Sequence, residues 1–298
     1  MRFLTKAFII SLSSLSVLGC ANAIAEEDPL TKAIPANPAW LTAQVPLRLH
    51  GNTYYVGTGG LSAVLIDTSA GLILIDAALP QTVSALEDNI RALGFRVEDI
   101  RYILSTEPHH DHAGGLAAIA RDSGAVVVTS PLAAQAIAQG RAPVDDPQNP
   151  NLEIFPSVTN VMAINDGETI NLGNVTITAV FTPGHTSGSV SWTWRSCEQD
   201  GCHDVVFASS LNAVGASDFR FTDHPDLVET FRHSFERVAG LDCDILISAH
   251  PDGSGLDTKL TVLQASRTPN PLLDDSACKT YVGRAIDRLN ARLLRERD

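Results

Sequence analysis

The densest group of residues that could carry chemistry is the run 107–112, which reads Glu-Pro-His-His-Asp-His. It directly follows the apolar stretch 102–105, which predicts a buried strand. We therefore expect the run in a loop at the carboxyl end of that strand, where a rigid sheet commonly presents reactive groups. A histidine-rich surface loop without function is the alternative. The density of ligand types and the flanking glycines 114–115 favour a metal site over that alternative.

The spacing within the run suggests two points of convergence. Glu107 and His109 alternate, so their side chains can aim at one point, while the adjacent Asp111 and His112 can aim at a second point nearby. Imidazole and carboxylate are both ordinary zinc ligands, with bonds of about 2.0–2.2 Å. His110 falls between these positions, and we expect it to support the ligands through a hydrogen bond rather than to bind metal.

Two distant histidines can complete such a site. His185 lies in the segment Thr-Pro-Gly-His-Thr-Ser-Gly-Ser, and His250 lies in Ser-Ala-His-Pro. Each follows a predicted strand. Either histidine alone is a weak signal, but together with the run 107–112 they make a plausible metal-ligand set.

The elements that must position these residues form a β-rich pattern that occurs twice. In the first half, short strands are predicted between 46 and 76, followed by a helix over 81–93, the strand 102–105, a helix over 113–122, a strand over 125–129 and a helix over 131–139. Residues 140–157 are rich in Pro, Asp and Asn and are predicted to be a loop.

In the second half, the β pattern restarts after that loop. The predicted elements are strands at 159–164, 169–172, 175–181, 188–195 and 204–208, a helix over 226–239, a strand at 244–248 and a last helix over 274–296. This order predicts one α/β domain over 26–298 in which two sheets carry a helix layer on each outer face. Residues 26–43, polar and proline-containing, are expected to form an extended arm.

The N-terminus has the features of an export signal. A short basic start precedes an apolar stretch at 7–19, and small-x-small cleavage patterns follow within 21–25. The apolar stretch is too short for a stable membrane span, so we expect 1–25 to be a signal peptide. Residues 17–20, Val-Leu-Gly-Cys, also resemble a lipoprotein box, and lipid attachment at Cys20 is the alternative.

Cysteine usage agrees with export. Four cysteines follow the signal region, and an even number in an exported protein suggests two disulfides. Four cysteines permit three pairings. Cys197 and Cys202 are near enough in sequence to close a tight loop, which would leave Cys243 with Cys278. Free or zinc-binding thiols are the alternative, although the spacings do not match a paired C-x-x-C zinc site.

Composition limits the possible partners. Hydrophobic residues make up 44% of the chain and charged residues 18%, enough for a substantial core. A formal charge of −13 argues against nucleic acid as a partner, because phosphate binding needs a basic face. Nothing beyond the signal region resembles a membrane span, and a monomer is the default expectation.

The ligand pattern resembles the metallo-β-lactamase superfamily, whose signature is H-x-H-x-D-H followed by two distant histidines. The resemblance extends from about Trp40 to the final helix. It implies a four-layer αββα sandwich with two mixed sheets and two bound zinc ions. One zinc would be held by Glu107, His109 and His185, and the other by Asp111, His112 and His250. Asp111 would also be catalytic, orienting a zinc-activated water.

Within that superfamily the sequence looks most like subclass B3. Ser210, near Asn212, stands where many relatives carry a bridging aspartate, and both residues become candidate substrate-binding groups. The pair Cys243 and Cys278 matches the disulfide of that subclass, and export would place the enzyme in the periplasm. The resemblance therefore implies hydrolysis of penicillins, cephalosporins or carbapenems. A lactonase or thioester hydrolase of the same superfamily, or an exported zinc-binding protein without catalysis, are the alternatives.

The one departure from the signature is Glu107, which stands in place of the first histidine, as in some members of the subclass. A carboxylate adds negative charge and tolerates several binding modes. We expect Glu107 to bind zinc, but more loosely than a site with three histidines would.

Overall fold

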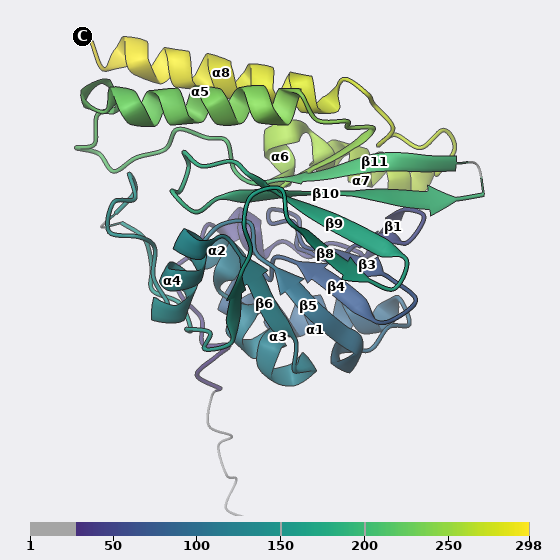
Figure 1. Cartoon of the computed structure of the whole chain (residues 1–298). Coiled ribbons are helices and arrows are strands. Elements are labelled where there is room, and N and C mark those ends of the chain that lie inside the picture. The colour runs from purple at the N-terminus through teal and green to yellow at the C-terminus, as the bar shows by residue number, and fades with distance from the viewer. Residues whose placement is uncertain (1–27, 150, 200, 298) are drawn as a thin grey trace, which may run out of the picture.

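The computed structural model describes residues 28–149, 151–199 and 201–297, and within them two β-sheets pack face to face between outer helices (Figure 1). Both sheets are mixed, because each contains parallel and antiparallel neighbours. The order of layers is helices, sheet, sheet, helices. This confirms the predicted αββα sandwich. The proposed signal region 1–25 and Cys20 lie outside the described residues.

The first sheet has seven strands that follow one another in chain order. Neighbours from β1 to β4 are antiparallel, and neighbours from β4 to β7 are parallel. The strands are β1 (Leu47–His50), β2 (Thr53–Tyr55), β3 (Val64–Asp67), β4 (Leu72–Ile75), β5 (Ile100–Leu104), β6 (Val126–Thr129) and β7 (Val161–Ala163).

The second sheet has five strands in the order β12-β11-β10-β9-β8. Only the β11–β12 pair is parallel; the other neighbours are antiparallel. The strands are β8 (Thr169–Leu172), β9 (Val175–Phe181), β10 (Val190–Glu198), β11 (Gly201–Ala208) and β12 (Ile245–Ser248).

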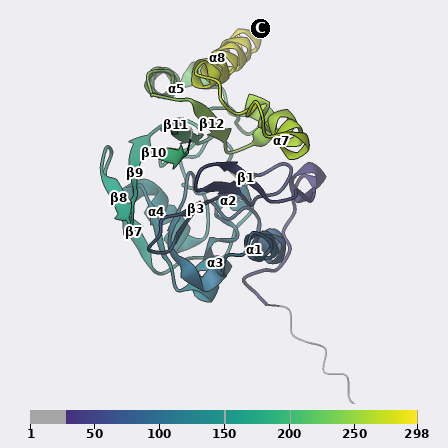
Figure 2. The same ribbon diagram turned by 90° about the vertical axis from the view of Figure 1, so that its right-hand side faces the viewer.

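Helices cover both outer faces and one edge. In Figure 1, α1 and α3 lie beneath the first sheet, while α5 and α8 lie above the second; Figure 2 shows α7 beside β1 at the edge. The helices are α1 (Val83–Ala92), α2 (His110–Ala113), α3 (Leu116–Ser123), α4 (Pro131–Gln139), α5 (Pro225–Ala239), α6 (Pro251–Ser254), α7 (Leu256–Ala265) and α8 (Ala277–Arg295). Short 3₁₀ turns are η1 (Pro38–Leu41), η2 (Pro80–Thr82), η3 (Val97–Asp99) and η4 (Phe221–Asp223).

Three apolar clusters separate the four layers. The cluster between the sheets contains Trp192 and Phe207, which are fully buried. A second cluster joins α1 and α3 to the first sheet, and a third joins α5 and α8 to the second sheet. β4, whose sequence is Leu-Ile-Leu-Ile, is buried along its whole length because it faces apolar groups on both sides.

The structure differs from the sequence-based expectation at three places among the helices, one of them the short helix α6, which was not predicted. The predicted helix 113–122 is broken: α2 begins at His110, inside the ligand run, and α3 follows after two glycines. The helix α7 was missed altogether. Leu256, Leu260 and Leu263 have helical spacing and pack into the cluster between the sheets. The small residues directly before them are typical of a loop, which favoured a loop over a helix here.

Both predicted disulfides are present. Cys197 and Cys202 are directly paired across β10 and β11, and they extend that hairpin beyond the predicted strand ends. Cys243, just before β12, is bonded to Cys278 in the first turn of α8. Among the described residues, no helix is both long and apolar enough to cross a bilayer.

Candidate metal centre

The run 107–112 lies where the first sheet meets the second. β5 ends at Leu104, and the chain then turns through the ligand run into α2. Asp76, which follows β4, fixes this turn: its carboxylate accepts hydrogen bonds from the backbone N–H of Thr106 at 2.8 Å and from the Thr106 hydroxyl at 2.6 Å. The ligand run is therefore held by the neighbouring parallel strand, as expected for a loop at the carboxyl end of a sheet.

The first ligand set consists of Glu107, His109 and His185, all buried. Glu107 Oε1 lies 3.9 Å from His109 Nδ1 and 3.5 Å from His185 Nε2. His185 comes from the turn between β9 and β10, so this set joins a loop of the first sheet to a loop of the second. The predicted first set is thus brought together in space.

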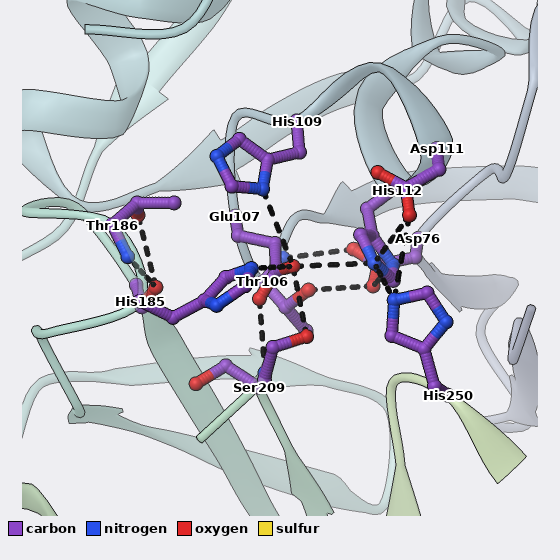
Figure 3. A network of polar contacts seen from close by, with 12 residues as sticks. Asp76, Thr106, Glu107, His109, Asp111, His112, His185, Thr186, Ser209 and His250 are labelled. Carbon is purple, nitrogen blue, oxygen red and sulfur yellow. Dashed lines mark hydrogen bonds and ion pairs between the residues drawn. The ribbon is translucent and has the colours of Figure 1, made fainter. Parts of the chain in front are cut away.

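The second ligand set consists of Asp111, His112 and His250. Asp111 Oδ2 lies 3.4 Å from the Nε2 atom of each histidine, and the two Nε2 atoms are 3.1 Å apart. The sets adjoin, because Glu107 Oε1 is also 3.2 Å from His112 Nε2. In Figure 3, Glu107 lies between His109 and His185 on one side and His112 on the other.

Three of the four histidines, His109, His185 and His250, have their second ring nitrogen within hydrogen-bond distance of a group outside the two ligand sets. His185 Nδ1 lies 2.7 Å from the backbone oxygen of Asn212, and His250 Nδ1 lies 3.3 Å from that of Gly60. His109 and His112 face carboxylates instead, those of Asp146 at 2.8 Å and Asp76 at 3.6 Å. Such partners orient a metal-binding imidazole and set which nitrogen keeps the proton. Three of the four rings are therefore oriented before any ligand is added, whereas His112 Nδ1 finds no hydrogen-bond partner among the described residues.

Burial and charge shift the pKa values of the site strongly. Burial alone would raise the pKa of Glu107, but the surrounding imidazoles, led by His112, bring it down to about 2. The pKa of Asp111 also lies well below its usual range because His112 and His250 outweigh the effect of burial. Conversely, burial would lower the pKa of His112, but Asp111 and Glu107 raise it to about 10. Buried carboxylates held as anions require nearby positive charge.

The donor set fits a metal ion. Two ionised carboxylates and four imidazoles converge as two adjacent groups of three, the usual number of protein ligands in a catalytic metal site that keeps a further position for water or substrate. In each histidine, the ring nitrogen that faces away from its supporting partner is the one that lies within a ligand set.

Ser210 and Asn212, the two candidate substrate-binding residues, lie directly after β11 beside the first set. The Ser210 hydroxyl donates to Glu107 Oε1 and its backbone N–H donates to Glu107 Oε2, both at 2.9 Å. Asn212 contributes its backbone oxygen to His185, while its buried side-chain Oδ1 has no hydrogen-bond partner among the described residues. The side chain of Ser210 thus serves Glu107 directly.

His110 belongs to neither ligand set. Its ring lies 6.1 Å from that of Trp40, and its Nδ1 finds no hydrogen-bond partner within the described part of the chain. The expected supporting hydrogen bond is therefore absent at that atom.

Three residues of the site were missed from the sequence: Asp76, Asp146 and Gln148. Asp76 follows a buried strand in the same way as the ligand run follows its own strand, which was a usable signal. Asp146 and Gln148 lie in the loop 140–157, where several acidic and amide residues occur together, and no pattern distinguished them. Only the folded loop shows that Asp146 is buried and that Gln148 Nε2 lies 3.3 Å from His185 Nε2.

A sequence model of the metallo-β-lactamase superfamily matches residues 49–250. Among solved structures, the chain is similar to a B3 metallo-β-lactamase described as the first with an active-site glutamic acid. The identity is 44% over 91% of this chain and 99% of that one, with a TM-score of 0.83. The Rm3 metallo-β-lactamase is 43% identical over 89% of this chain and 100% of its own, with a TM-score of 0.85. For metallo-β-lactamase SMB-1 the identity is 43% over 86% and 99%, with a TM-score of 0.84.

Curated relatives are more distant. Lactamase-like protein nscB of Arthroderma otae is 29% identical over 67% of this chain and 51% of its own length. Thioesterase pkgB of Emericella nidulans is 28% identical over 69% of this chain and 47% of its own length. The chain thus spans about half the length of these relatives.

Proposed function

This chain belongs to the metallo-β-lactamase superfamily, and from that premise we propose that it is a zinc-dependent β-lactamase of subclass B3 acting on penicillins, cephalosporins and carbapenems. The observation that carries the proposal is the first ligand set. Glu107 lies there together with His109 and His185, and a solved B3 enzyme that shares 44% of its sequence with this chain is described by its active-site glutamic acid.

Zinc is the metal that suits the donors. Imidazole nitrogen and carboxylate oxygen are its ordinary ligands, and three protein ligands per ion are usual in catalytic sites. Glu107, His109 and His185 would hold one ion, and Asp111, His112 and His250 the other. When bound, zinc supplies Lewis acidity and lowers the pKa of water to about 7, which makes a nucleophile available at neutral pH.

Asp111 is the residue best placed to handle the proton of the attacking water. Its Oδ2 faces the two Nε2 atoms of the second set, which leaves Oδ1 to accept a hydrogen bond from water. In the reaction, the water oxygen adds to the lactam carbonyl carbon, the C–N bond breaks, and the ring nitrogen takes a proton. Asp111 would orient the water in the first step. No covalent bond to the protein is required.

Substrate binding falls more naturally to Asn212 than to Ser210. Both hydrogen-bond donors of Ser210 are used by Glu107, whereas the Asn212 side chain carries an amide N–H₂ group that can donate to a carboxylate. We therefore assign the substrate carboxylate to the Asn212 amide. Ser210 would contribute through Glu107, with a direct contact to substrate as the lesser role.

We further propose that residues 1–25 direct export to the periplasm, where the mature chain acts as a monomer. The two disulfides support this location, because disulfides persist in oxidising compartments. Lipid attachment at Cys20 is the alternative, and the mass of the mature protein isolated from cells distinguishes the two.

The proposal is tested with purified protein reloaded with zinc. A penicillin, a cephalosporin, a carbapenem, an acyl-homoserine lactone and an acyl thioester are each supplied with and without a chelator. We expect chelator-sensitive opening of the lactams. Asp111→Asn is expected to lose most of that turnover, while Asp287→Asn, an exposed substitution on α8, keeps it.

Two results would reject the β-lactamase proposal. Turnover of the lactone or the thioester alone would favour another hydrolase of the superfamily, an outcome to which the similarity with Thioesterase pkgB gives some weight. Stoichiometric zinc binding with no turnover of any substrate would favour a zinc-binding protein without catalysis.

A further inference from the structure

The loop between α4 and β7 carries one buried acid among exposed neighbours. Val144 is 86% exposed and Asp145 is exposed, yet the side chain of Asp146 is completely buried. Burying a carboxylate is unfavourable unless its oxygens are paired. The position of Asp146 therefore calls for a specific partner, and the partner is a metal-ligand candidate.

The two oxygens of Asp146 serve two different parts of the molecule. Oδ2 lies 2.8 Å from Nε2 of His109, whose side chain is also buried. Oδ1 accepts a hydrogen bond from the backbone N–H of Gln148 at 2.9 Å, which closes a tight turn within the loop. One carboxylate thus ties the fold of the loop to the orientation of an imidazole.

The pairing determines where the proton of His109 lies. An ionised carboxylate only accepts hydrogen bonds, so the imidazole must carry its proton on Nε2. In the neutral ring, the lone pair is then on Nδ1, which is the atom that faces Glu107. The opposite tautomer would place an N–H where a metal ligand is needed.

The other ring of the first set depends on a different kind of partner. His185 Nδ1 lies against the backbone oxygen of Asn212, which every residue type supplies. Of the two rings in the first set, His109 is the one whose second nitrogen faces a side chain, and that side chain lies 37 residues away in the sequence. We propose that Asp146 is a positioning residue that fixes the His109 tautomer and thereby the metal affinity of the first ligand set. The proposal rests on the metal site of the proposed function but not on its substrate.

Asp146→Asn gives the sharpest test. An amide has one acceptor, so it can serve either His109 or the N–H of Gln148, but its NH₂ group must face the other donor. With the loop turn kept, the amide donates to His109 Nε2 and favours the tautomer with the proton on Nδ1. We expect first-set zinc affinity to fall by about 10- to 100-fold, the usual effect of losing such a partner, with the second set unchanged.

Two measurements follow the effect separately. Titration of metal-free protein with zinc against a competing chelator gives the affinity of each set. Nitrogen-15 NMR of the imidazoles in metal-free protein gives the tautomer of His109, a readout that a general loosening of the loop would not reverse. Asp145→Asn is the matched control, because it makes the same change at the exposed neighbouring residue. Asp146→Glu restores a carboxylate and is expected to recover the wild-type tautomer and part of the affinity.

The outcomes are distinguishable. An unchanged tautomer together with a zinc affinity within twofold of wild type in Asp146→Asn would overturn the proposal, as would an equal loss in Asp145→Asn. If the wild type hydrolyses no β-lactam but Asp146→Asn shifts both readouts, the proposed substrate is wrong and the role of Asp146 stands. If the wild type binds zinc and opens lactams while neither readout shifts, the proposed function stands and the role of Asp146 is rejected.

Discussion

The two ligand sets contain the same groups, one carboxylate and two imidazoles, but they are built in different ways. In the second set, Asp111 and His112 are adjacent on the single turn of α2, and His250 remains 21% exposed beside Trp40. In the first set all three ligands are buried, and their partners come from distant segments, Ser210 and Asp146. Both sets take two ligands from the run 107–112 and one distant histidine, but the first set also takes hydrogen-bond partners for its ligands from the side chains of remote loops.

This difference bears on how firmly the carboxylate of Glu107 is held. The sequence alone suggested a loosely held ligand, because a carboxylate can bind in several ways. In the structure, both of its oxygens accept hydrogen bonds from Ser210. Hydrogen bonds to a charged group contribute about 1.5–3 kcal/mol each, enough to hold the carboxylate in one orientation. Glu107 is therefore fixed in place, although its charge still distinguishes it from histidine.

The largest effect is expected from breaking the second set. His112→Ala removes the imidazole that contacts Asp111, Glu107 and His250, so catalysis should collapse. We expect kcat/KM to fall on the order of a thousandfold or more, because a catalytic metal supplies several kcal/mol of transition-state stabilisation. Steady-state kinetics on zinc-loaded protein measure this. His233→Ala, on the exposed face of α5, is the control and should keep wild-type activity.

A smaller effect is expected from changing the carboxylate of the first set. Glu107→His should strengthen zinc binding at that set, because imidazole suits zinc better than carboxylate does. It should also destabilise the metal-free protein by about 1–3 kcal/mol, because Ser210 loses the acceptor for two buried donors. Zinc titration and denaturant unfolding measure the two effects. Equal zinc affinity in variant and wild type would contradict the idea that Glu107 tunes this set.

Ser210→Ala provides the complementary change. It keeps Glu107 but removes the hydroxyl donor, and we expect first-set zinc affinity to fall about tenfold, equivalent to about 1.4 kcal/mol. Ser217→Ala, exposed in the same connection, is the matched control. A loss confined to the Michaelis constant, with zinc affinity intact, would instead indicate that Ser210 contacts substrate.

The smallest expected effect is the pH dependence of stability. Its sign for Glu107, in the first set, is opposite to its sign for His112, in the second. The pKa of Glu107 is lowered to about 2, so its contribution to stability is present above the unfolded value near 4.3 and is lost as pH falls toward 2. The pKa of His112 is raised to about 10, so its contribution is present below about 6.5 and is lost as pH rises toward 10. Denaturant unfolding of metal-free protein across pH 2–10 should show both losses.

Two substitutions identify the groups that cause the loss of stability at acid pH and the loss at alkaline pH. Glu107→Gln should reduce the acid loss without removing it, because the pKa of Asp111 is also lowered. His112→Gln should reduce both losses, because His112 leads the imidazoles that lower the pKa of Glu107. An acid loss that is unchanged in His112→Gln would contradict the coupling of Glu107 to His112.

The sequence was sufficient for the parts of the molecule that depend on local pattern. Alternating or continuous apolar runs predicted most strands, and the spacing in 107–112 with two later histidines predicted all six converging side chains. The spacing also divided the four ligands of the run 107–112 into two pairs, and the family resemblance assigned His185 and His250 to them. The disulfide Cys197–Cys202 followed from short separation.

What could not be predicted depends on contacts between segments far apart in the chain. Asp146 is one of several acidic residues in a polar loop, and only the folded loop makes it buried. The pairing of Ser210 with Glu107 joins positions 103 residues apart. The leucines of α7 have helical spacing, but nothing local to residues 256–265 indicates that they pack between the two sheets.

Each ligand set draws two members from the segment that follows β5 and one from the second sheet, His185 or His250. An ion in either set would therefore act as a cross-link between the two halves of the sandwich. Metal retention then depends on how closely the halves fit as well as on the ligands. Substitutions at inter-sheet positions such as Trp192 and Phe207, which belong to neither ligand set, are accordingly expected to alter metal retention.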